Sequence, residues 1–133
     1  MLIHCHLPKD KLYPGTFRSD EHYANSKVRK RLERIKDSIK DIGFMNPLSC
    51  GNDKDDGTYR VNRGNNCLRA AIELNIKSIP CIVYCREDQK RIPEGKQINR
   101  SELQKFHKSE IKQIAREEPK WFGVYPVDTW KYE

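Results

Sequence analysis

Residues 58–74, TYRVNRGNNCLRAAIEL, predict a short strand, a tight turn and a helix. Tyr59 and Val61 alternate with polar neighbours, which is the period of a strand. Gly64 permits a backbone conformation that a side chain would disfavour, so it suits the turn. The buried stripe expected on the following helix comprises Leu68, Ala71, Ile72 and Ile76.

The start of this helix is a candidate anion site. Asn65 or Asn66 can cap the helix. A strand-to-helix turn leaves free N–H groups and the positive end of a helix dipole, which together suit a phosphate. Arg63 and Arg69 add full positive charges nearby. The alternative is a plain capped helix in an α/β domain, because glycine turns before helices are common.

Composition limits the chain to one polar domain. Its 133 residues suit a single modest core, and only 36% of them are hydrophobic. The 26 basic and 19 acidic residues give a net charge of +7, which favours a polyanionic partner if the charge is clustered. No apolar run approaches the length of a membrane span, and the amino terminus lacks signal-peptide features. We therefore expect a cytoplasmic protein without a membrane partner.

The most basic element is a helix expected from about residue 25 to residue 42. Val28, Leu32 and Ile35 begin an apolar stripe that continues to Ile42, and Gly43 ends the helix. Its cations are the candidates for contact with a nucleic-acid backbone: Lys27, Arg29, Lys30, Arg31 and Arg34. A solvated helix face with mixed charge pairs is the alternative.

The five cysteines favour buried, reduced thiols. They are odd in number and scattered, and none forms a CxxC pair. A zinc site made from His4, His6 and two cysteines is the alternative that this pattern favours less. Residues 51–57 contain several aspartates but lack the terminal glutamate of an EF-hand, so we expect a hairpin turn and no metal site.

The remaining segments complete an α/β unit. We expect strands at residues 2–7, 48–50 and 79–85, with a loop at residues 19–26. The domain organisation that follows is a core at residues 1–85 and an extension at residues 86–133. The extension would comprise a polar connection at 86–100, a helix at 101–118, and an aromatic tail containing Trp121, Tyr125 and Trp130. We expect the tail to pack on the same domain, although it could instead bind a protein partner or stack bases.

Four motifs share their order and spacing with a known family. Residues 3–18, IHCHLPKDKLYPGTFR, hold an opening strand and a downstream arginine. Residues 38–48, SIKDIGFMNPL, hold a helix end and a following proline. Residues 59–71, YRVNRGNNCLRAA, are similar to the turn pattern Y-x-I-x-x-G-E-R-R-x-R-A-A, and residues 79–83, IPCIV, hold the next strand. Together they resemble the amino-terminal domain of ParB-type proteins in the ParB/sulfiredoxin superfamily, which implies an α/β (α+β) fold with a small mixed sheet and packed helices.

The resemblance also implies a nucleotide pocket, with Mg²⁺ between the phosphates. Arg18 and Asn46 match positions that line the family's pocket. Residues 97–103, QINRSEL, faintly resemble a further family box, in which Asn99 and Arg100 would form a lid. The complete set of implied phosphate- or nucleotide-binding residues is Arg18, Asn46, Arg63, Gly64, Asn65, Asn66, Cys67 and Arg69.

The signature turn departs from the family pattern. Asn65, Asn66 and Cys67 replace Glu-Arg-Arg, so the acidic residue and two cations are absent. Cys67 lies three residues after Gly64, whereas the catalytic cysteine of sulfiredoxins follows the glycine directly, so that chemistry is not transferred. We expect phosphate binding to persist through the backbone and the arginines, and expect Arg69→Ala to abolish it without affecting folding.

Three functions remain open. The first is a nucleotide-binding domain, with NTPase, kinase or nuclease activity uncertain because the turn carboxylate is lost. The second is a DNA-binding or nuclease-like module with weak sequence specificity, since no helix-turn-helix follows the domain. The third is a catalytically silent adaptor, of a phage or plasmid accessory type, that binds a protein partner through its aromatic tail.

Overall fold

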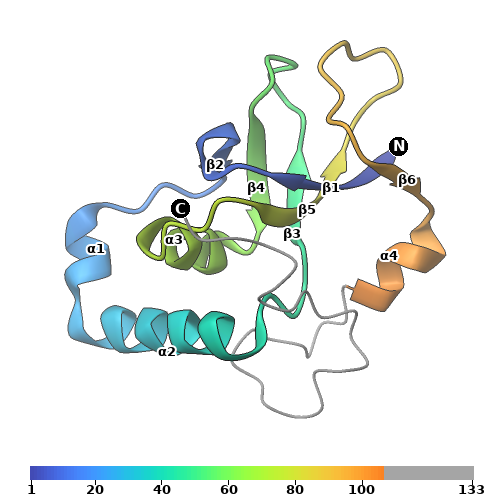
Figure 1. Ribbon diagram of the computed structural model, residues 1–133. Coiled ribbons are helices and arrows are strands. Elements are labelled where there is room, and N and C mark those ends of the chain that lie inside the picture. Colours follow the sequence, from blue (N-terminus) through green and yellow to red (C-terminus); the bar gives the residue numbers. More distant parts are fainter. Residues whose placement is uncertain (107–133) are drawn as a thin grey trace.

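The structure is a computed structural model and describes residues 1–106 of the chain. A six-stranded mixed sheet has the order β2-β4-β3-β5-β1-β6 (Figure 1). Its strands are β1 (Leu2–Leu7), β2 (Leu12–Pro14), β3 (Leu48–Gly51), β4 (Tyr59–Arg63), β5 (Ile79–Tyr84) and β6 (Lys96–Ile98). The helices are α1 (Asp20–Ala24), α2 (Ser26–Ile42), α3 (Asn65–Glu73) and α4 (Arg100–Phe106), with a 3₁₀ turn at Lys9–Lys11. The predicted class, a small mixed sheet with packed helices, is confirmed.

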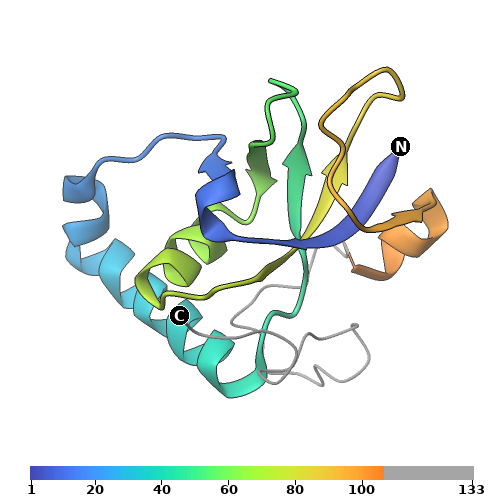
Figure 2. The same cartoon turned by 45° about the horizontal axis from the view of Figure 1, so that its top comes forward.

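Strand pairing brings distant segments together. β1 lies antiparallel to both β5 and β6, and β3 lies antiparallel to β4. β2 pairs with β4, and β3 with β5, in parallel. In both cartoon views, α3 lies between α2 and the strands on one side of the sheet (Figures 1 and 2).

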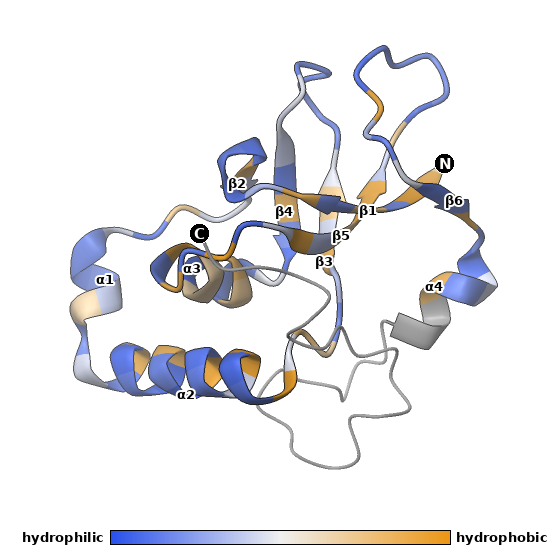
Figure 3. Cartoon of the chain, in the orientation of Figure 1, coloured by the Kyte–Doolittle hydropathy of each residue, from blue (hydrophilic) through white to orange (hydrophobic). Residues whose placement is uncertain are grey.

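Helix α2 forms where the periodicity predicted it. The side chain of Asn25 caps it by accepting a hydrogen bond from the N–H of Lys27 at 3.1 Å. Gly43 ends it with a φ of 81°. Apolar and hydrophilic residues alternate along α2 (Figure 3). Most of its charged residues are exposed, but Arg29 and Lys36 are half-buried. Leu32, Ile35 and Ile39 are buried, and each contributes about 1.5–3 kcal/mol to folding.

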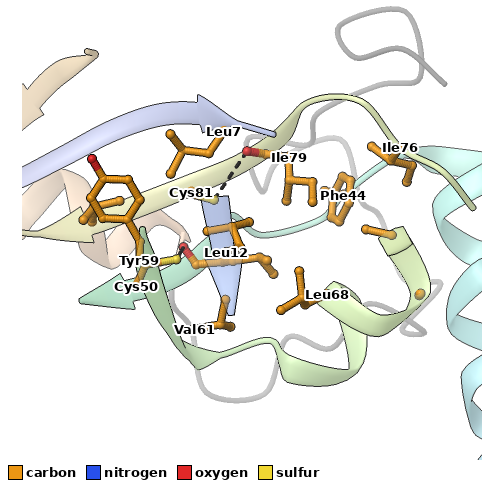
Figure 4. Close-up of a cluster of buried hydrophobic side chains, with 14 of the residues drawn as sticks. Leu7, Leu12, Phe44, Cys50, Tyr59, Val61, Leu68, Ile76, Ile79 and Cys81 are labelled. Atoms are coloured by element: carbon orange, nitrogen blue, oxygen red, sulfur yellow. Dashed lines mark hydrogen bonds between the residues drawn. The ribbon is translucent and has the colours of Figure 1, made fainter. Parts of the chain in front are cut away.

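The core lies between the sheet and helices α2 and α3. Leu68 of α3 packs with Phe44, Ile76 and the strand residues Val61 and Ile79 (Figure 4). The stripe predicted for α3 was partly wrong. Ala70 is buried, whereas Ile72 is 39% exposed. A helix placed between a sheet and a second helix needs small side chains on both packed sides, and the two consecutive alanines, Ala70 and Ala71, supply them.

Three short elements were not predicted. The predicted loop at 19–26 contains α1, which Ser19 caps and whose Tyr23 is buried. β2 and β6 each have three residues, too few for a period-2 pattern to be recognised. The predicted connection at 86–100 therefore contributes an edge strand to the sheet, where Ile98 pairs with Leu2. The aromatic tail, and the predicted helix beyond residue 106, lie outside the described residues.

Two loops lie beyond the same end of the sheet (Figure 2), and hydrogen bonds between side chains of one and the backbone of the other join them. The Asp55 carboxylate, in the loop between β3 and β4, accepts hydrogen bonds from the N–H groups of Lys90 and Arg91. Asn52 Nδ2 donates to the Arg91 carbonyl at 3.2 Å. The hydrogen bonds from Lys90 and Arg91 lower the pKa of Asp55. The aspartate-rich turn thus holds a neighbouring loop.

None of the helices among residues 1–106 combines the length and the apolar character that crossing a membrane requires.

The hydrogen bonds from the Lys90 and Arg91 amides to the Asp55 carboxylate, here called the Asp55 clamp, should depend on pH. The folded-state pKa of Asp55 is lowered. The hydrogen bonds of its carboxylate therefore stabilise the fold fully at pH values above the ordinary aspartate pKa. That stabilisation is lost as the pH falls through the lowered, folded-state pKa. An NMR titration of the Lys90 and Arg91 amides should therefore show a midpoint below the ordinary aspartate pKa. Asp55→Asn should increase hydrogen exchange at both amides. Asp88→Asn, which changes an exposed residue of the loop that contains Lys90 and Arg91, should not. A midpoint at or above the ordinary value would contradict the clamp.

Candidate functional site

Gly64 sets the geometry of the turn between β4 and α3. Its φ of 100° and ψ of 26° are left-handed, and its carbonyl accepts the hydrogen bond from the Leu68 N–H at 2.8 Å. A Cβ at this position would collide with the side chain of Leu48 on β3. Both facts require glycine here, as the sequence predicted.

The predicted cap of α3 was wrong. Gly64 itself is the N-cap residue and Asn65 is already helical, so no side chain caps the first turn. The side chains of Ser19, Asn25 and Asn99, in contrast, accept hydrogen bonds at the starts of α1, α2 and α4. Helix α3 therefore begins with first-turn N–H groups that no side chain caps, which is the arrangement an anion can use.

Asn65 fastens a neighbouring segment to the turn. Its Oδ1 accepts a hydrogen bond from the Gly15 N–H at 3.1 Å, and its Nδ2 donates to the Val61 carbonyl at 3.3 Å. The Gly15 N–H also lies 3.0 Å from the Val61 carbonyl oxygen. Asn65 stands where the family pattern has a glutamate, and in this structure its amide holds the segment after β2 in place.

Strand pairing gathers several of the predicted site residues. Arg63, at the end of β4, is exposed and pairs with Ser49 at the start of β3. Asn46 lies two residues before Leu48, the residue in contact with Gly64, and its buried Oδ1 has no hydrogen-bond partner among the described residues. Arg18 is exposed and lies three residues after the anchored Gly15. Arg63, Asn46 and the first turn of α3 therefore lie near one end of β4, and Arg18 lies at most about 11 Å along the chain from Gly15.

Arg69, predicted to bind phosphate, is engaged within the protein. Its Nε lies 2.8 Å from Glu73 Oε2, and its Nη2 lies 3.6 Å from Asp20 Oδ1. Its guanidinium carbon lies 4.4 Å from the centre of the Tyr23 ring. Replacing Arg69 would disturb the contact between α1 and α3, so Arg69→Ala cannot isolate ligand binding from packing.

The Glu73 carboxylate forms ion pairs with three cations, Arg29 and Lys36 of α2 and Arg69 of α3. It accepts both hydrogen bonds of an Arg29 fork, at 2.6 and 2.9 Å, and lies 3.4 Å from Lys36 Nζ. Burial alone would raise its pKa, but the Arg69 hydrogen bond and the Arg29 and Lys36 charges together lower it. Arg29, predicted to contact nucleic acid, is thus paired with α3. The other predicted cations of α2 are exposed: Lys27, Lys30, Arg31 and Arg34.

The thiol of Cys67 is not activated. Burial raises its pKa to about 12, although the charge of Arg31 acts in the opposite direction. The thiol is therefore protonated at neutral pH and is a poor nucleophile. Residues 1–106 contain no group of three or more His, Cys, Asp or Glu side chains that could hold a metal ion.

The predicted lid lies far from the turn. Asn99 follows β6, at the edge of the sheet opposite β2, and its Oδ1 caps α4 by accepting from the Glu102 N–H at 2.9 Å. Four strand spacings separate β6 from β4, a distance of about 19 Å. Asn99 and Arg100 are therefore not part of the site gathered around Gly64.

Comparisons with known proteins identify similar folds. A scan of protein-family models and a search of curated proteins both found no match. The chain is similar to the truncated chromosome-partitioning protein ParB from Caulobacter crescentus complexed with CTP-gamma-S. That match has 24% identity, covers 64% of this chain and 46% of that one, and has a TM-score of 0.47. Sulfiredoxin from Arabidopsis thaliana matches at 24% identity, covering 63% of this chain and 84% of that one, with a TM-score of 0.45.

A free serine kinase in complex with AMP matches at 16% identity, with a TM-score of 0.48. That match covers 65% of this chain and 32% of the kinase chain. The chain thus spans less than half the length of the ParB and kinase chains that it matches. The ParB/sulfiredoxin-like fold that the motifs predicted is thus confirmed.

The Gly64 turn can be tested by a pair of glycine substitutions. Gly57→Ala changes a residue with a φ of 90° and open space around it, so it should cost only the backbone strain, about 1–2 kcal/mol. Gly64→Ala adds the collision with Leu48 and should cost about 1–3 kcal/mol more. Urea unfolding of both variants measures the difference. Equal losses of stability would contradict the close approach of Leu48 to the turn.

Proposed function

We propose that the Gly64 turn binds the phosphate group of a nucleotide or of a nucleic acid. The observation that carries the proposal is that α3 begins without a side-chain cap, while the helices α1, α2 and α4 each have one. An anion placed there accepts hydrogen bonds from the first-turn N–H groups and lies at the positive end of the helix dipole.

Two exposed arginines supply the charge for such a site. Arg63 precedes Gly64 directly, and Arg18 follows the segment that Asn65 holds at the turn. Neither has an ion pair among residues 1–106, whereas Arg29 and Arg69 are both paired with Glu73. Guanidinium groups bind phosphate oxygens through paired N–H donors, so these two arginines are well suited to close on a phosphate.

The residues present do not fit a protein-held Mg²⁺ ion. Residues 61–68, VNRGNNCL, contain no carboxylate. The carboxylates of Asp20 and Glu73 both contact Arg69, and Glu73 is further neutralised by Arg29 and Lys36. Because Mg²⁺ sites for nucleotides normally use one or two carboxylates, we derive no reaction step through a metal and propose binding rather than catalysis.

A second candidate function is non-specific contact with nucleic acid through α2. The exposed cations of this helix include Lys27, Lys30, Arg31 and Arg34. Arg29 and Lys36 of the same helix form ion pairs with Glu73. Exposed cations on one helix can neutralise backbone phosphates without reading the sequence. Binding to the α2 surface does not involve the Gly64 turn. Substitutions at one place therefore distinguish the phosphate site from the α2 surface.

Substitution of the exposed arginines tests the proposal. Arg63→Gln and Arg18→Gln should each weaken binding of ATP or CTP, measured by calorimetry, by about fivefold, because each removes roughly 1 kcal/mol of surface charge interaction. Their melting temperatures without ligand should be unchanged. Arg86→Gln is the matched control, since Arg86 is an exposed arginine beyond the opposite end of the sheet.

The pattern of losses distinguishes the candidates. Unchanged nucleotide affinity in both variants would contradict the phosphate site. Binding of single-stranded DNA that falls with salt, and is lost in Lys30→Gln with Arg34→Gln but kept in Arg63→Gln, would favour the α2 surface. If neither nucleotides nor DNA bind a folded sample, the adaptor function with a protein partner would be the one to pursue.

A further inference from the structure

The segment from Gly15 to Asp20 is anchored to α3 at both ends. At one end, the Gly15 N–H donates to Asn65 Oδ1 at 3.1 Å. At the other end, Asp20 Oδ1 lies 3.6 Å from Arg69 Nη2, and the Arg69 guanidinium covers the Tyr23 ring. Asn65 and Arg69 are four residues apart, so both anchors lie on the same face of α3, about one turn from each other.

Phe17 and Arg18 lie in the middle of this anchored segment, residues 15–20. Both cartoon views draw the segment as an extended run from β2 to α1 (Figures 1 and 2).

Phe17 is the most exposed large apolar residue among those described, with 82% of its surface accessible. A single exposed phenyl ring needs no explanation by itself. The position of Phe17 suggests a role in binding. Phe17 directly precedes Arg18, and it lies two residues, at most about 7 Å, from the anchored Gly15. The anchored segment thus carries an exposed aromatic ring next to a cation, two and three residues after the Gly15 contact with the start of α3.

We infer that Phe17 stacks on the aromatic base of the ligand whose phosphate lies at the Gly64 turn. This inference rests on the proposed function and extends it from phosphate binding to recognition of a base. In a nucleotide the sugar separates the base from the phosphate, so the stacking ring must lie beside the turn and not within it. Phe17 meets that condition, since it lies two residues further along the anchored segment than Gly15, whose N–H contacts the turn.

Asn46, two residues before the Leu48 that contacts Gly64, is a second candidate polar group. Asn46 Oδ1 is buried and has no hydrogen-bond partner in the part of the chain that the structure describes. An amide oxygen accepts hydrogen bonds, and a sugar hydroxyl or a base amine can supply the missing donor. A ligand that carries a sugar and a base therefore fits the residues around the turn better than inorganic phosphate does.

Stacking defines the class of ligand. Every base has a π-face, so a single phenyl ring selects bases over sugar phosphates without selecting one base over another. The shared chemistry, a base linked to a phosphate, is present both in a free nucleotide and in a single nucleic-acid strand. The experiment must therefore compare these two sources.

The experiment measures affinities of the full chain for AMP, TMP, ribose 5-phosphate, inorganic phosphate and a short oligothymidylate. Nucleotides should bind about tenfold more tightly than ribose 5-phosphate, which is the expected effect of one stacked base. Phe17→Leu, which keeps apolar bulk but removes the ring, should abolish that difference, and Phe17→Tyr should retain it. Upfield shifts of the base protons in NMR spectra should accompany stacking and vanish in Phe17→Leu.

Tyr84→Leu is the matched control. Tyr84 is a 58% exposed aromatic residue at the end of β5, where it pairs with Gly51, whereas the Gly64 turn contacts Leu48 at the start of β3. This variant should bind every ligand as the natural chain does. A loss of affinity in Tyr84→Leu equal to that in Phe17→Leu would overturn the assignment of Phe17.

The remaining outcomes separate this inference from the function on which it rests. If all phosphate compounds bind equally well, base stacking is wrong and the phosphate site stands. If none binds, both are wrong. If nucleotides are favoured and depend on Phe17, a tighter, salt-dependent affinity for oligothymidylate than for TMP identifies a strand as the source. Equal affinities identify a free nucleotide.

Discussion

The direction in which α3 leaves the sheet depends on one residue without a side chain. Gly64 turns the chain through a left-handed conformation, and Leu48 fills the space that a Cβ would need. This close approach places the start of α3 beside the beginning of β3 and the end of β4. It also leaves Asn65 free to bind Gly15 instead of capping the helix. The uncapped helix start, and the contact of Gly15 with it, follow from that single backbone constraint.

Some cations of the protein form ion pairs between helices, and others are exposed at the surface. Glu73 neutralises Arg29, Lys36 and Arg69 and thereby holds α1, α2 and α3 together. Burying a carboxylate is tolerated only when such partners satisfy it, so these cations are not available to a ligand. Arg18 and Arg63 lie outside this cluster and are exposed. The net charge of +7 therefore overstates the charge that a ligand meets at the turn.

Elements with a clear period were predictable from sequence, and contacts between elements were not. The stripe of α2, the strand before Gly64 and the glycine turn all follow local rules. β6 has three residues and exists because it pairs with β1, which no local pattern reveals. Arg69 was predicted to bind a ligand, but it pairs with Glu73, four residues later. That i,i+4 spacing was a signal present in the sequence. The role of Asn65 depends on Gly15, fifty positions earlier, and could not have been found this way.

The most direct test of a phosphate site at the Gly64 turn is an NMR titration of the labelled protein with a nucleotide. The account predicts that the backbone amides of Asn65, Asn66 and Cys67 shift downfield together, because each gains or strengthens a hydrogen bond to an anion. The amides of Ser26 and Lys27, at the side-chain-capped start of α2, should stay unchanged. Saturable shifts confined to other surfaces, with the three turn amides unmoved, would contradict the central claim.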